Sequence, residues 1–331
     1  MSSDPSASAG ATTTTGAATT LGPGPAITTG QTDDEETTPT GGGKPRGLWS
    51  DAWFDLRRKP LFWISSGVIL LLLVMSIWPS LFTSVDPTRA NLSESLDRPS
   101  RQHVLGVDVQ GYDLYARAVY GTRVSIIVGL LATLGATVLG GVVGMLAGFY
   151  GGAVDAAFSR ITDIFLGLPF ILGAIVLLTT FIVPGESSKV KITSMVIIGL
   201  VSFGWPVFAR MMRAAVISAR SQDYVVAARA LGASNARIIW RHLLPNCLTP
   251  LLVLSTISLG GYIVAEATLS FLGIGLQYPV ISWGVMLNDA QDYIKVVPHT
   301  MVAPAIFLSV TVLTFVMLGD VVREALDPKL R

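Results

Sequence analysis

Residues 221–246 read SQDYVVAARALGASNARIIWRHLLPN, a charged stretch between two long apolar runs. The alanines at its centre favour helix, and Gly232 is suited to end that helix in a left-handed conformation. Asn235 is expected to cap a second helix, and Pro245 lies where that helix should end. The stretch therefore predicts two short helices joined at a glycine, a shape suited to docking onto a soluble partner.

The composition is typical of a polytopic membrane protein. Of 331 residues, 51% are hydrophobic and 14% are charged. The net charge is +1, which gives no reason to expect nucleic acid as a partner. The single cysteine, Cys247, cannot form an intrachain disulfide and is expected to be a small apolar residue at a helix start.

Residues 1–50 differ from the rest of the chain. They are rich in Thr, Gly, Ala, Ser and Pro and show no apolar periodicity, so we expect a disordered cytoplasmic tail. No basic start is followed by an apolar run, so this is not a signal peptide. A solvated extension is the expected role, and a regulatory or partner-binding arm is the alternative. Residues 51–331 are predicted to form a transmembrane domain.

Six charge-poor runs approach or exceed the roughly 20 apolar residues that a helix needs to cross the hydrocarbon core. The predicted spans lie near 61–82, 124–150, 164–183, 192–209, 248–265 and 297–319. Residues 267–287 are also uncharged, but their glycines and proline predict a short re-entrant or surface piece. The glycines of the second run predict a helix-packing face, with a substrate path as the alternative. The predicted fold class is an all-α polytopic membrane protein with six transmembrane helices.

The distribution of positive charge predicts the orientation. With the N-terminus inside, 15 of the 23 Lys and Arg residues fall on inner segments and 8 on outer ones. The positive-inside rule favours this arrangement, which makes both termini cytoplasmic and places the loop 214–247 inside. Residues 111–123 have apolar positions at helical spacing and are expected to form an amphipathic helix on the outer interface.

Motifs for catalysis are absent from the sequence. The run Gly41-Gly42-Gly43-Lys44-Pro45 lacks the spacing of a phosphate-binding loop, and its proline removes a backbone donor. No H-E-x-x-H zinc pair or G-x-S-x-G nucleophile elbow is present. We therefore predict no catalytic residue, no cofactor-binding residue and no metal ligand. The chain is not expected to be an enzyme, and any driving energy should come from a partner.

Charged residues near apolar runs are functional candidates because intramembrane charge is costly. Glu266 follows the fifth run and is a candidate for the translocation path, where it would contact a substrate amine. The alternative places Glu266 at the outer boundary, solvated or bonded to neighbouring backbone. Arg160 and Asp163 lie three residues apart, which predicts a local ion pair on one helix face.

The charged loop resembles the EAA loop of ABC-transporter permease subunits. Ala227-Ala228, Gly232 and Leu244-Pro245 stand at its spacing, and Val226 replaces the glutamate that names it. The sequence of the loop resembles that of permeases from the dipeptide, oligopeptide and nickel branch of importers, which often lack that glutamate. The resemblance runs from about Trp53 to the end and includes the segments 103–125, 266–275 and 318–331.

The resemblance implies a type I ABC importer permease fold with a cytoplasmic coupling-helix loop, in a cell membrane. It implies a permease subunit that forms the translocation path for di- or oligopeptides by alternating access. Import of nickel or another small solute is the alternative within the family. The implied partners are a second homologous permease subunit, two ATP-binding subunits and an extracellular substrate-binding protein. The rival class is an ion-coupled secondary transporter, which predicts coupling charges buried in mid-span.

The resemblance also assigns the loop residues to ATPase docking. The docking candidates are Asp223, Tyr224, Ala227, Ala228, Arg229, Gly232 and Arg237. Small side chains would permit close approach of the ATPase subunit, and the arginines would surround that contact. The alternative is an ordinary basic cytoplasmic loop that anionic membrane lipid holds.

Overall fold

The computed structural model describes residues 53–182 and 188–326, so the tail predicted over 1–50 lies outside the described residues. Helices make up the regular structure of the described ranges, with one isolated β-bridge between Val107 and Asp113. The longer helices are α2 Pro60–Ile77, α3 Leu114–Tyr150, α4 Gly152–Gly167, α5 Phe170–Phe181, α6 Lys189–Arg220, α9 Leu244–Phe271 and α11 His299–Leu326. The short ones are η1 Pro79–Leu81, η2 Leu92–Glu94, α7 Asp223–Ala230, α8 Asn235–Arg237, the π-helical η3 Ile238–Leu243, α10 Trp283–Ala290 and η4 Gln291–Tyr293.

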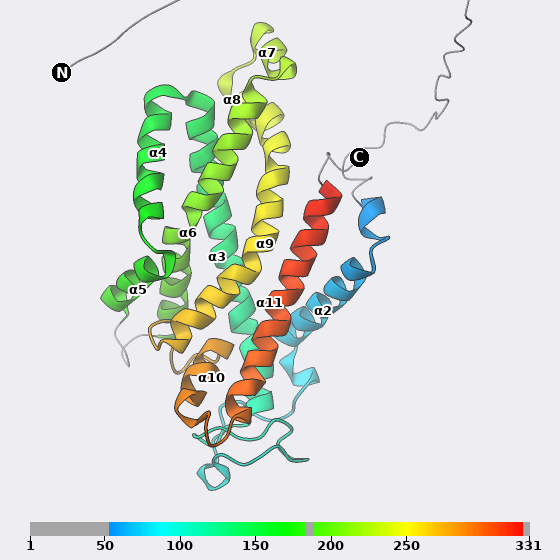
Figure 1. Ribbon diagram of the computed structural model, residues 1–331, viewed down its shortest axis with the longest axis vertical. Helices are drawn as coiled ribbons and strands as arrows, with labels where there is room; N and C mark the ends of the chain where they lie inside the picture. The colour runs from blue at the N-terminus through cyan, green and yellow to red at the C-terminus, as the bar shows by residue number, and fades with distance from the viewer. Residues whose placement is uncertain (1–52, 183–187, 327–331) are drawn as a thin grey trace, which may run out of the picture. The chain divides into compact units, whose positions relative to one another are not determined.

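The predicted all-α polytopic class is confirmed. Five helices of the described residues are long and apolar enough to span a membrane: α2, α3, α6, α11 and the continuous stretch Asn235–Phe271 that contains α9. The pair α4 and α5 makes a sixth span if it is counted as one, although its two halves are bent by 86°. Figure 1 shows α7 at one end of the long helices and α10 at the opposite end.

The third predicted span, 164–183, differs most from the structure. The chain is not one helix there, because α4 ends at Gly167 and α5 begins at Phe170. Leu168 adopts an extended conformation (φ −92°, ψ 131°), as expected for the residue before a proline. Pro169 then precedes the first turn of α5, where a missing N–H costs no helical hydrogen bond. One proline therefore divides into two helices an apolar run that was predicted from composition as a single span.

Helix α3 starts ten residues before the predicted span. The Asp113 carboxylate caps it by accepting a hydrogen bond from the Ala116 N–H (2.7 Å). The prediction of an amphipathic interfacial helix over 111–123 is wrong, because residues 114–123 are the first turns of α3. Arg117 lies buried against the carboxylate of Asp108 (2.6 Å) rather than at an interface.

Helices α3 and α6 approach closely through glycines spaced four residues apart. A Cβ atom at Gly140 would lie 2.6 Å from the Cβ of Phe208, and one at Gly144 would lie 2.8 Å from the Cβ of Met212. A Cβ atom at Gly148 would lie 2.9 Å from the Cβ of Val216. Small residues allow this approach of two backbones in a membrane protein. The predicted packing face is therefore confirmed at these positions.

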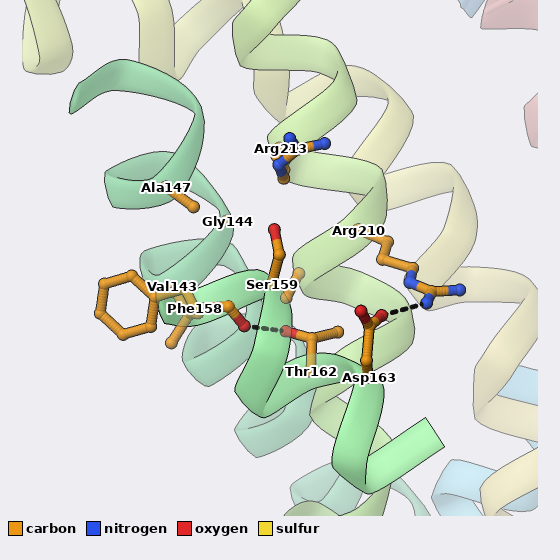
Figure 2. Close-up of a pocket in the computed structure, with 10 residues that line it drawn as sticks. Val143, Gly144, Ala147, Phe158, Ser159, Thr162, Asp163, Arg210 and Arg213 are labelled. Carbon is orange, nitrogen blue, oxygen red and sulfur yellow. Dashed lines mark hydrogen bonds and ion pairs between the residues drawn. The ribbon is translucent and has the colours of Figure 1, made fainter. Parts of the chain in front are cut away.

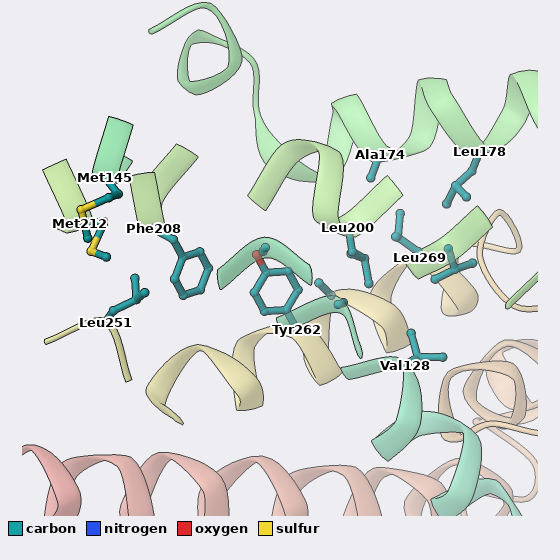
Figure 3. Close-up of a cluster of buried hydrophobic side chains, with 14 of the residues drawn as sticks. Val128, Met145, Ala174, Leu178, Leu200, Phe208, Met212, Leu251, Tyr262 and Leu269 are labelled. Carbon is teal, nitrogen blue, oxygen red and sulfur yellow. The ribbon is translucent and has the colours of Figure 1, made fainter. Parts of the chain in front are cut away.

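A buried apolar cluster forms around this contact. Figure 3 shows side chains of α3, α5, α6 and α9 meeting, among them Met145, Leu178, Phe208 and Tyr262. Helices α2 and α11 pack on the other side of α3 and α9. An ion pair between Lys59 and Glu324 joins the start of α2 to the last turns of α11. The core thus holds α6 rigidly against α3, and α6 leads directly into the loop of interest.

A substitution of Gly144 by alanine tests the close approach. The added methyl group must displace Met212 or the α6 backbone, so we expect a loss of about 1–3 kcal/mol in stability. The measurement is the thermal unfolding midpoint of the purified protein in detergent. Gly67→Ala in α2 is the matched control, because nothing lies within 4 Å of a Cβ at Gly67. Equal midpoints for both variants would contradict the packing role.

Candidate functional site

The first helix of the loop, α7, ends as its sequence predicts. Gly232 has φ +80°, in the left-handed region. The Ala233 N–H bonds the carbonyl of Ala228, and the Gly232 N–H bonds the carbonyl of Arg229, both at 3.0 Å. These two bonds are the Schellman arrangement, which satisfies the last carbonyls of a helix. The predicted glycine cap is confirmed.

The second helix differs from its prediction at both ends. Ser234, rather than Asn235, is the N-cap, and its hydroxyl accepts a hydrogen bond from the Arg237 N–H. The helix does not end at Pro245 but continues through η3 into α9. The π-helical turn of η3 lies directly before the proline, whose ring would clash with a carbonyl of a regular α-turn. The wider turn accommodates the proline, and the loop becomes an extension of a membrane helix.

Helix α7 fully buries one side chain against the protein, while large apolar residues at this end of the molecule are exposed. Val225 is buried in the main cluster, together with Ile238 of η3. Leu231 is 88% exposed, Val226 57% and, on η3, Trp240 71%. Apolar side chains that project from the end of a helical protein mark a surface for protein–protein or membrane contact. Leu231 and Trp240 were not among the predicted docking residues, although an apolar residue directly before a capping glycine was a usable signal.

The predicted docking residues fall on this same projection. Asp223, Ala227, Arg229, Gly232 and Arg237 are exposed, and Ala228 is half-buried. Asp223 lies in the first turn of α7 and Arg229 in the last, which complements the helix dipole. A Cβ atom at Gly232 would meet nothing within 4 Å, so the tip of the loop is open for close approach.

Tyr224 is a predicted docking residue whose ring also contacts another part of its own chain. Its ring lies 6.4 Å from that of His242 on η3. Burial raises the pKa of the Tyr224 hydroxyl above its usual value. Tyr224 therefore helps to hold α7 against the second helix while 40% of it remains exposed.

Two ion pairs hold α4 against α6 near the loop. Asp163, Arg210 and Arg213 also line a cavity of 380 Å³, and Figure 2 shows the pair of Arg210 with Asp163 there. Arg213 binds both carboxylate oxygens of Asp155, with its Nη2 2.6 Å from Oδ2. Arg210 Nη2 lies 2.6 Å from Oδ1 of Asp163. The predicted pair of Arg160 with Asp163 is wrong, because Asp163 faces α6 and pairs with Arg210. Sequence spacing identifies partners within a helix but not partners on a neighbouring helix.

The last turn of α6 is tied to the end of α3. The Arg220 guanidinium donates to the Gly148 carbonyl (2.9 Å) and, more weakly, to that of Phe149 (3.4 Å). Only Ser221 and Gln222 separate this residue from α7. Arg220 thus ties the base of α7 to the end of α3.

Glu266 lies near the end of α9 and is fully buried. Its Oε1 accepts hydrogen bonds from Ser270 (2.8 Å) and from Ser282 at the start of α10 (3.1 Å). Its Oε2 has no partner in the described ranges. In this conformation the carboxylate is sealed from solvent and joins α9 to α10. Its assignment to the translocation path stays a prediction.

The end of the molecule opposite α7 carries a second ionic cluster, which the sequence did not reveal. Arg117 contacts Asp108 at 2.6 Å and Asp289 of α10 at 3.4 Å. Burial raises the pKa of Asp289, and the nearby guanidinium opposes that shift. His103 Nδ1 lies 2.8 Å from Asp113, the cap of α3. These contacts fix the segment before α3 and the helix α10 onto the same end.

Comparison with known proteins gives a family for most of the chain. Residues 140–331 match the family described as binding-protein-dependent transport system inner membrane component. Residues 47–99 match the N-terminal transmembrane domain of oligopeptide transport permease C.

Two relatives match over nearly their whole length. The chain is 38% identical to a dipeptide transport system permease protein of Alkalihalophilus pseudofirmus, over 86% of this chain and 90% of that protein. It is 34% identical to an oligopeptide transport system permease protein of Bacillus subtilis, over 87% of this chain and 92% of that protein.

A solved structure shares the fold. A chain of the MetNI methionine ABC transporter, in an inward-facing conformation, superposes with a TM-score of 0.51 at 23% sequence identity. The match covers 63% of this chain and 96% of that one. The fold is therefore that of a type I ABC importer permease. Together, the long apolar helices, the projecting loop and these matches show that the chain belongs to the family of binding-protein-dependent transport system inner membrane components, as a multi-pass permease subunit of an ABC importer.

Proposed function

We propose that this permease carries di- or oligopeptides across the membrane by alternating access, together with a second homologous permease subunit. Two ATP-binding subunits would hydrolyse ATP, and an extracellular substrate-binding protein would deliver the peptide. The names of the two relatives above support the substrate class. Because the chain belongs to a family of ABC importer permeases, the alternative of an ion-coupled secondary transporter is disfavoured.

The observation that carries ATPase docking is the exposed apolar end of α7. Leu231 packs on almost nothing in its own chain, yet a Schellman cap holds its backbone in place. A rigid, preformed apolar contact loses little conformational entropy on binding. Arg229 and Arg237 surround it with positive charge that would pair with acidic groups of the ATPase subunit.

The proposed orientation puts α7, both chain termini and the tail 1–50 in the cytoplasm. The excess of Lys and Arg on the inner segments supports it. Lys59 and Glu324 pair near the two ends of the membrane domain, which agrees with termini on one side. The end formed by residues 83–113 and α10 would then face the substrate-binding protein.

The proposed coupling runs from α7 into α6 and then to α4. ATP-driven closure of the ATPase subunits would move α7, and the Arg213–Asp155 and Arg210–Asp163 pairs would carry α4 along with α6. Because α4 is bent against α5, movement of α4 would alter the break at Leu168 and Pro169.

Substitution of Leu231 by aspartate tests docking. The fold does not use this side chain, so the variant should reach the membrane normally. The buried interface would acquire an unpaired charge, which should weaken ATPase binding by about 2–5 kcal/mol. The measurement is the amount of ATPase subunit that co-purifies with the permease in mild detergent.

Leu92→Asp is the matched control, since Leu92 is 75% exposed at the opposite end of the molecule. It should retain the wild-type amount of ATPase. Equal retention by the Leu231 and Leu92 variants would show that α7 is not the docking helix, and lipid contact would become its explanation.

Removing the Arg213–Asp155 pair tests coupling. Arg213→Gln should lower peptide uptake per ATP hydrolysed by roughly two- to fivefold, since a half-exposed pair contributes about 0.5–1 kcal/mol. Exchanging the two residues, in the double variant Arg213→Asp and Asp155→Arg, should restore part of the loss. The measurement is simultaneous uptake and phosphate release in proteoliposomes. A loss of ATP hydrolysis in proportion to uptake would argue against a coupling role.

A further inference from the structure

A second cavity, of 520 Å³, opens at the break between α4 and α5. Five of its twelve lining residues are aromatic, and the walls come from four helices. The lining includes Phe165, Leu168, Phe170, Phe203, Val207 and Tyr262. The rings of Phe165 and Phe203 lie 5.6 Å apart, and those of Phe170 and Tyr262 lie 6.0 Å apart. The volume lies within the range of small-molecule sites, about 300–1,000 Å³.

The cavity lies at mid-membrane depth. Phe203, Gly204 and Val207 are near the centre of α6, which runs from Lys189 to Arg220. Ser258, Gly261 and Tyr262 lie within α9 rather than at its ends. Both helices are long enough to span the hydrocarbon core, so the break between α4 and α5 faces its interior.

Lipid tails are a poor occupant for this position. Irregular backbone at membrane depth is tolerated where it is covered by protein or lines an aqueous cavity, but not where it faces lipid. The chain is irregular at Leu168 and Pro169, and Leu168 is 51% exposed. The first N–H groups of any helix lack intrahelical partners, and at α5 the N-cap residue Pro169 supplies no side-chain acceptor for them. Polar backbone groups are thus available next to aromatic walls.

Tyr262 supplies a polar side chain at the same place. It is 6% exposed, and its ring packs on Phe170 and Phe208. Its hydroxyl lies beside Gly204, another lining residue of the cavity, since a Cβ atom built on Gly204 would lie 1.8 Å from it. Among the side-chain hydrogen bonds of the described residues, none involves this hydroxyl. A tyrosine that is this well buried usually has a hydrogen-bond partner. A ligand in the cavity would supply one.

From this geometry we infer that the cavity between α4, α5, α6 and α9 is a subsite for an apolar or aromatic side chain of the transported peptide. The inference rests on the proposed function. The aromatic walls receive the side chain, and the Tyr262 hydroxyl donates a hydrogen bond to a backbone carbonyl of the peptide. In secondary transporters, substrate sites lie at discontinuous helices near the bilayer midplane, and the break between α4 and α5 offers the same kind of position here.

The test uses the whole transporter in liposomes, with its second permease, its ATPase subunits and its binding protein. ATP-dependent uptake is measured for two radiolabelled probes, Ala-Ala-Ala and Ala-Phe-Ala. Val207→Trp fills the cavity from an exposed position, so it should reduce the Ala-Phe-Ala to Ala-Ala-Ala uptake ratio by roughly tenfold or more. The same substrate-binding protein serves the wild-type and the variant transporter. Its own selectivity therefore cancels when the uptake ratio of the variant is compared with the wild-type ratio.

Two further variants sharpen the test. Tyr262→Phe removes only the hydroxyl, so it should raise KM for both peptides about fivefold and leave the ratio unchanged. Ile198→Trp is the matched control, because nine residues along α6 turn it to the opposite side of the helix from Val207. It should transport both peptides like wild type.

The outcomes separate the two proposals. If the wild-type transporter takes up neither peptide, the proposed function fails and the subsite fails with it. If uptake occurs and Val207→Trp leaves the ratio unchanged, the subsite alone is overturned, and a lipid tail becomes the occupant to consider. If Val207→Trp loses the second permease subunit during purification, that subunit fills the cavity and the inference is again overturned.

Discussion

The close approach of α3 and α6 is the contact on which the other features depend. Glycines at 140, 144 and 148 remove the side chains that would hold the two backbones apart. This approach places Arg220 within reach of the carbonyls that end α3, and it leaves Arg213 facing α4. Helix α7 follows after two residues, so its position depends on a packing contact deep in the membrane domain.

The sequence predicted local structure well where a single residue determines it. Gly232 ends α7 in the left-handed conformation that its position suggested, because few other residues adopt φ +80° without strain. The apolar runs predicted the membrane helices, since hydrocarbon thickness sets a minimum length. The resemblance of the loop identified the family, which the comparisons confirmed.

Features that depend on contacts between helices could not be predicted in the same way. Asp163 had a candidate partner three residues away, but the structure pairs it with Arg210, 47 residues along the chain. Glu266 is bonded to Ser282 beyond a glycine-rich turn, and nothing in the local sequence indicates that contact. The proline at 169 was visible, yet only the structure shows that it turns two half-helices by 86°.

The exposure of Leu231 has a consequence for how such a protein diverges. Its side chain contributes almost nothing to the fold of its own chain, so packing within the chain places little restriction on which side chain stands there. The backbone beneath it is nevertheless held by the Gly232 cap. If α7 docks as proposed, sequence change at this tip can follow the surface of the partner without a cost to the fold of the permease.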